Sequence, residues 1–93
     1  MEAIGLLEVQ ALAAAIEGLD AMLKAANVRL VHIERRLGGR LVTMVVAGTV
    51  SAVTSAVEAG RTAAARIGNV KCCGVIARPH GEVTKFFTDF NAK

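Results

Sequence analysis

The sequence predicts an α+β fold in which the elements follow the order strand, helix, strand, strand, helix, strand. Three observations support this. Four short apolar runs are bounded by turn residues, two alanine-rich segments repeat apolar residues at helical spacing, and a glycine pair separates the two middle runs. This order is typical of the ferredoxin-like split arrangement, an antiparallel sheet with two helices on one face.

Strands are expected at residues 3–9, 28–36, 41–47 and 70–77. The third run is almost entirely apolar, which predicts a strand buried on both faces. Gly38 and Gly39 stand between the second and third runs, where they favour a tight hairpin turn.

Helices are expected at residues 11–26 and 50–67, with a short third helix at 82–87. Thr49 precedes the second helix as a suitable N-cap, and Gly60 within that helix suggests a close approach between helices. The residues expected on the core-facing stripes are Leu12, Ala15, Ile16, Leu19, Leu23 and Ala26 in the first helix, and Val50, Val53, Val57, Ala64 and Ile67 in the second.

Length and composition limit the class of protein. The 93 residues are enough for one domain, expected at 3–87 with a tail at 88–93, and 54% hydrophobic residues exclude a disordered chain. Aromatic residues at 3% and a net charge of +3 argue against a nucleic-acid partner. The start of the chain lacks a basic leader and no run is long enough to span a membrane, so we expect a cytoplasmic protein.

The sequence offers little that could support catalysis or metal binding. The carboxylates are scattered, and the two histidines are better explained by packing for His32 and by a turn hydrogen bond for His80. Cys72 and Cys73 are adjacent on a strand, so they would point to opposite faces and form neither a disulfide nor a metal site. We expect both to act as small hydrophobic residues packed in the core or at an interface. No enzyme, cofactor or metal is therefore predicted, and an enzyme using His80 and Glu82 is the least favoured alternative.

Arginines surround the glycine turn. Arg35, Arg36 and Arg40 flank Gly38 and Gly39. In an isolated domain such a turn is most simply a solvated basic loop, but guanidinium groups and exposed backbone N–H groups also attract carboxylates and phosphates.

Five blocks of the sequence carry a resemblance to a known family. Residues 5–9, 20–28, 41–43, 48–60 and 75–80 resemble, in the same order, the hexamer-forming shell proteins of bacterial microcompartments, above all those of the propanediol and ethanolamine types. The resemblance covers residues 3 to 87, nearly the whole chain.

The resemblance implies a structural role in the shell of a bacterial microcompartment. Six copies would form a disc, and discs would tile into a wall with other shell proteins around encapsulated enzymes. Lys24, Asn27 and Arg78 match family positions at the edge between discs. The hairpin would surround a pore for small metabolites on the sixfold axis, lined by Arg36, Leu37, Gly38, Gly39 and Arg40.

The hairpin also departs from the family pattern. It is one residue longer than usual and lacks the common serine, so pore width and selectivity are not carried over, and His32 replaces a usual glycine. Phe86, Phe87 and Phe90 form an unusual aromatic cluster near the end of the chain. A ferredoxin-like regulatory domain that binds an anionic effector remains the alternative; it would be a dimer or trimer.

Overall fold

The computed structural model describes residues 2–87. The expected tail at 88–93, which includes Phe90, lies outside the described residues. The elements are β1 (Ala3–Gln10), α1 (Leu12–Ala25), β2 (Arg29–Arg36), the short 3₁₀ helix η1 (Leu37–Gly39), β3 (Leu41–Gly48), α2 (Val50–Ala65), β4 (Val70–Ile76) and α3 (Gly81–Thr84).

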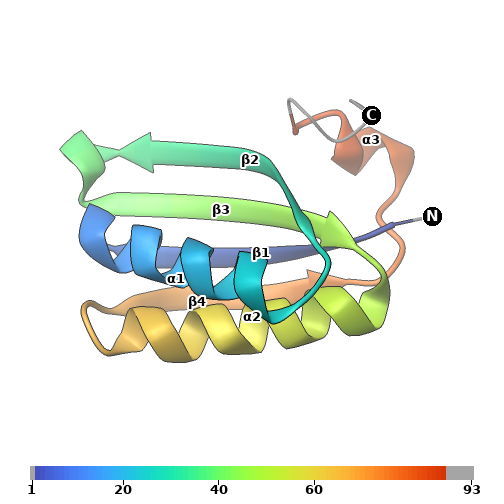
Figure 1. The fold of residues 1–93 in the computed structure, drawn as a ribbon. Coiled ribbons are helices and arrows are strands. Elements are labelled where there is room, and N and C mark those ends of the chain that lie inside the picture. The colour runs from blue at the N-terminus through green and yellow to red at the C-terminus, as the bar shows by residue number, and fades with distance from the viewer. Residues whose placement is uncertain (1, 88–93) are drawn as a thin grey trace.

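The four strands form one antiparallel sheet in the order β2-β3-β1-β4. Helices α1 and α2 pack side by side on one face of this sheet, as Figure 1 shows. The predicted α+β fold and its strand and helix order are confirmed. The third predicted helix is shorter than expected, because α3 spans only Gly81–Thr84.

The main core lies between the sheet and the two helices. On the helix-covered face, Leu7 of β1 lies opposite Met44 of β3, and Val9 lies opposite Val42. Val46 of β3 belongs to the same cluster. The period-2 alternation of a strand places these residues on one side, and the near-complete burial of β3 matches its apolar sequence.

The two helices approach one another through glycine. A Cβ atom added at Gly60 would lie 2.5 Å from Met22 Cγ and 3.1 Å from the Gly18 carbonyl oxygen. A side chain at this position would push the helices apart, which explains why Gly60 stands within α2 despite its cost of about 1 kcal/mol relative to Ala. The predicted close approach is confirmed.

This contact corrects the predicted core-facing stripe of α1. The buried residues of α1 are Ala14, Ala15, Gly18 and Met22. Leu12, Ile16 and Leu23 were expected inside and are instead exposed. The buried side of α1 thus consists of small residues and Met22, whereas the large apolar residues Leu12, Ile16 and Leu23 lie on the outer side. The same correction applies to Val50 and Ile67 at the ends of the α2 stripe, which are exposed.

Among residues 2–87, the other face of the sheet is covered only at one end. Val83 of α3 and Phe87 pack against a small cluster of Ile4, Val31, Val45 and Ala47. His80 begins α3 as its N-cap, because His80 Nδ1 accepts a hydrogen bond from the Glu82 backbone N–H at 3.0 Å. The turn hydrogen bond expected of His80 is confirmed.

Candidate functional site

The turn between β2 and β3 has an unusual backbone. Leu37, Gly38 and Gly39 all have positive φ, at 55°, 66° and 91°. Glycine adopts this conformation freely, whereas Leu37 pays a penalty of about 1 kcal/mol. The turn is held in place because the Ala11 backbone N–H, just before α1, donates to the Arg40 carbonyl oxygen at 3.1 Å. A fixed, glycine-rich tip with an exposed leucine results.

The three arginines around this turn point in different directions. Arg36 Nε donates to Glu34 Oε2 at 2.6 Å. Arg40 Nε donates to the Leu37 carbonyl oxygen at 3.2 Å, so this guanidinium folds over the turn itself. The structure therefore does not gather the three charges into one cluster within a single chain.

Arg35 lies on the opposite face of β2 from Arg36. With Leu12, Gly38 and Gly39 it lines an open cavity of about 300 Å³ between the turn and the start of α1. Sequence reasoning could not find this cavity, because it depends on how α1 begins beside the turn.

Glu34, on β2 just before the turn, interacts with two side chains of the same strand, Arg36 and His32. Hydrogen bonding from Arg36, and then from His32 at 3.4 Å, lowers the pKa of the Glu34 carboxyl below its ordinary value. A carboxyl with a lowered folded-state pKa favours the folded chain at neutral pH, and this contribution is lost as pH falls through that pKa. Both side chains are partly solvated, so the effect on stability is small.

The residues predicted at the disc edge lie away from the turn. Lys24 stands in the last turn of α1, Asn27 follows that helix, and Arg78 follows β4. Figure 1 shows that α1 and β4 both run from the η1 end of the molecule toward the opposite end. All three side chains are exposed.

Lys24 forms an ion pair within its own helix. Its ammonium lies 2.9 Å from Asp20 Oδ2, and this hydrogen bond raises the pKa of Lys24. The side chain keeps 76% of its surface exposed. An exposed pair of this kind contributes little to stability, so Lys24 is available for contacts outside the chain.

The prediction for the two cysteines is half right. The register places Cys72 opposite Glu8 and Cys73 opposite Leu7, so the thiols do face opposite sides of the sheet. Both are exposed within the chain, however, so neither is a core residue. They lie on β4, which is an edge strand of the sheet.

Large apolar side chains remain exposed over much of the described surface, which sequence reasoning had largely missed. These residues are Leu12, Ile16, Leu23, Ile33, Leu37, Val50, Ile67, Val75, Ile76 and Phe86. Such a surface is typical of a chain that associates with other chains.

The described residues hold no evident centre for metal chemistry. Within residues 2–87, no group of three or more His, Cys, Asp and Glu side chains is arranged to bind a metal ion. Over the same range, no helix is both long and apolar enough to cross a membrane.

Comparison with known proteins identifies the family. The BMC domain model matches residues 3–79. The chain is 51% identical over 84 residues to the bacterial microcompartment shell protein PduA of Salmonella typhimurium, covering 90% of this chain and 88% of PduA. It is 47% identical over 87 residues to the bacterial microcompartment shell protein EutM of Escherichia coli K12, covering 94% and 89% of the two chains.

A solved structure gives the same result. A microcompartments protein from Desulfitobacterium hafniense DCB superposes with a TM-score of 0.78 at 41% identity, over 89% of this chain and 44% of that one. This chain therefore spans less than half the length of that protein. Fold and relatives together define a shell-protein class, and the chain belongs to the BMC domain family.

The Glu34 interaction gives a first testable prediction. Arg36→Gln removes the main hydrogen bond to the Glu34 carboxylate, so the pKa of Glu34 should rise toward its ordinary value. Carboxyl NMR during a pH titration measures this pKa directly. Arg40→Gln is the matched control, because Arg40 contacts the Leu37 carbonyl instead. An unchanged pKa in Arg36→Gln would show that Arg36 does not pair with Glu34 in solution.

Proposed function

We propose that this chain is a non-enzymatic shell protein that forms cyclic hexamers. Residues 3–87 would act as a single shell domain, with 88–93 as a tail. Family membership supports the shell role, since the named relatives are microcompartment shell proteins. The observation that carries the proposal is the exposed apolar surface on α1 and on the sheet edges, because closed rings bury such surfaces between copies.

The rings would tile into the wall of a bacterial microcompartment in the cytoplasm. Lys24, Asn27 and Arg78 would meet the neighbouring ring. Each is exposed at the end of an element, and Lys24 has only a weak pair within its own chain to lose. The partners would be copies of this chain, other shell proteins and encapsulated enzymes, with neither nucleic acid nor membrane involved.

The β2–β3 turn would line a central pore with Arg36, Leu37, Gly38, Gly39 and Arg40. Residues 34–40 hold three arginines and one glutamate, which leaves two net positive charges per chain. Sixfold repetition would turn this into a charged ring, with a summed field that draws in anions and repels cations. Small anionic or polar metabolites are thus the proposed cargo of the pore.

If Lys24 lies at the edge between hexamers, its substitution should affect sheet formation without affecting hexamer formation. Lys24→Ala should leave the hexamer intact and strongly reduce sheet formation, because only an exposed ion pair is lost within the chain. Sheets are scored by electron microscopy, and hexamers by size-exclusion chromatography. Lys85→Ala is the matched control, since Lys85 is also an exposed lysine paired within its chain, 2.9 Å from Glu82. Normal sheets from Lys24→Ala would remove Lys24 from the edge.

The pore role predicts charge-dependent transport. Arg36→Gln combined with Arg40→Gln should lower anion entry into reconstituted shells several-fold, since the field at the ring is weakened. The control variant combines Arg61→Gln with Lys85→Gln, which removes the same charge from exposed pairs remote from the turn. Equal anion entry in the two variants would contradict a basic rim.

A further inference from the structure

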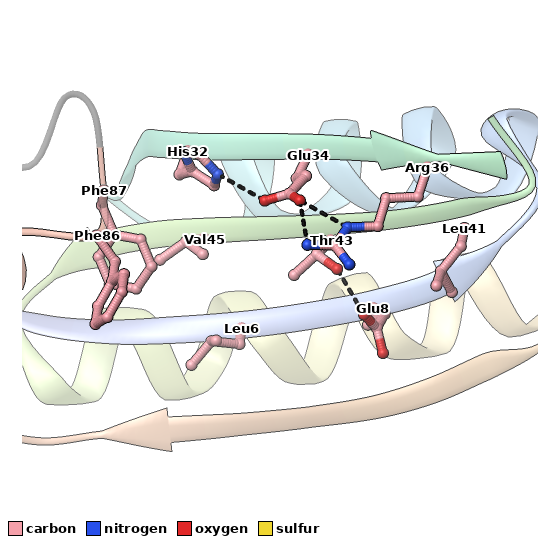
Figure 2. Close-up of a pocket in the computed structure, with 10 residues that line it drawn as sticks. All are labelled: Leu6, Glu8, His32, Glu34, Arg36, Leu41, Thr43, Val45, Phe86 and Phe87. Atoms are coloured by element: carbon pink, nitrogen blue, oxygen red, sulfur yellow. Dashed lines mark hydrogen bonds and ion pairs between the residues drawn. The ribbon is translucent and has the colours of Figure 1, made fainter. Parts of the chain in front are cut away.

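A groove crosses the sheet face that α1 and α2 leave open. It has a volume of about 330 Å³, and its floor is formed by side chains of β1, β2 and β3. Figure 2 shows Phe86 and Phe87 at one end, with Leu6, Val45 and His32 beside them, and Glu8, Glu34, Arg36 and Thr43 toward the other end. The groove therefore has an apolar half and a polar half.

The polar half is a row of residues that face one another across the strands. Glu34 of β2 is opposite Thr43 of β3, Thr43 is opposite Glu8 of β1, and Glu8 is opposite Cys72 of β4. The row thus crosses the whole sheet. Its position depends on the pairing register and is invisible in the linear sequence.

Glu8 is the unusual member of this row. Its carboxylate accepts hydrogen bonds from Thr43 Oγ1 at 2.6 Å and from Cys72 Sγ at 3.6 Å, and both donors are neutral. No lysine or arginine among residues 2–87 forms an ion pair with Glu8, whereas Glu34 in the same row is paired with Arg36. A half-buried carboxylate held only by neutral donors leaves a negative charge uncompensated on the groove floor.

Burial and the nearby Glu8 carboxylate both raise the pKa of the Cys72 thiol. The thiol therefore keeps its proton and remains a neutral donor to Glu8. The groove floor consequently favours a cation and disfavours an anion.

We propose that this groove binds a small primary ammonium with a short apolar chain. The ammonium would donate to the Glu8 carboxylate, and the chain would lie over Leu6 and Val45 toward Phe86. Leu6 is two residues from Glu8 on the same face of β1, a spacing of about 6.8 Å, which a chain of about five carbons spans. The groove is large enough for such a molecule, since its volume is about 330 Å³.

Charge and donor set argue for an organic cation in particular. A bare metal ion would need several ligands, and no suitable group of three exists within the described range. Glu8, Glu34 and Arg36 are the acidic and basic side chains that line the groove, and Arg36 pairs with Glu34, so their charges sum to minus one. The groove contains none of the proposed edge residues, and it shares Arg36 with the proposed pore lining.

The test compares two probes of equal size on the full chain in its native assembly. Methyl resonances of Leu6 and Val45 are followed by NMR during titration with n-pentylammonium chloride or with 1-pentanol. The ammonium should give saturable shifts and bind about tenfold more tightly than the alcohol, as expected of one charge-assisted hydrogen bond in a partly solvated site. This comparison needs no variant, so folding defects cannot obscure it.

Three variants locate the interaction. Glu8→Gln should weaken ammonium binding about tenfold and leave pentanol binding unchanged. Phe86→Ala, at a residue that is 78% exposed, should weaken both probes. Glu58→Gln on α2 is the matched control and should change neither, since Glu58 is exposed and paired with Arg61.

Three outcomes would overturn the proposal. Equal affinities for the two probes, or unchanged ammonium binding in Glu8→Gln, would show that the groove is merely apolar. No saturable shift at Leu6 and Val45 would show that the groove does not admit a small molecule, as would be the case if another copy of the chain covered it.

Discussion

The close contact between α1 and α2 determines which side chains this chain can bury. Gly18 and Gly60 allow the two backbones to approach until the carbonyl oxygen of one glycine is in contact range of the other. Ala14, Ala15 and Met22 face inward on α1, and Met22 Cγ occupies the space that a Cβ on Gly60 would need. The larger residues Leu12, Ile16 and Leu23 are left on the outer side of α1. A short chain that leaves so much apolar surface in water gains stability by associating with copies of itself.

The same arrangement leaves the second face of the sheet open. Because both long helices lie on one side, the part of residues 2–87 that covers the other face is α3 with Phe87, and it covers one end of that face (Figure 1). The remaining floor carries the polar row with Glu8 and Thr43 (Figure 2). The packing of both helices on one face of the sheet thus leaves the outer side of α1 exposed and leaves the groove open on the other face.

The fold could be read from the sequence because its signals are local. Strand alternation, the Thr49 cap and the glycine turn each act within a few residues, and the structure has all three. Thr49 accepts a hydrogen bond from the Ala52 backbone N–H, as its position predicts. The buried face of α1 was predicted wrongly because periodicity favours the stripe with the largest apolar residues. In the structure, three of the four buried residues of α1 are alanine or glycine.

The candidate site could be predicted only in part, because some of its contacts join residues that are far apart in the sequence. The residues of the turn are consecutive, so sequence could place Leu37, Gly38 and Gly39 together, and the structure does the same. The pairing of Arg36 with Glu34 and the opposite orientation of Arg35 follow from the alternation along β2. The folding of Arg40 over the Leu37 carbonyl depends on the turn's positive φ angles. The row from Glu34 to Cys72 requires the register of four strands, which no local pattern specifies.

We propose that exposed apolar surfaces on this chain close into a ring of six. Native mass spectrometry of the purified protein at moderate salt measures the number of copies in the assembly. A dominant hexamer is expected, in which the β2–β3 turns repeat around one axis. A dominant monomer, dimer or trimer would contradict it, because the arginines of residues 35–40 would then belong to an ordinary basic turn.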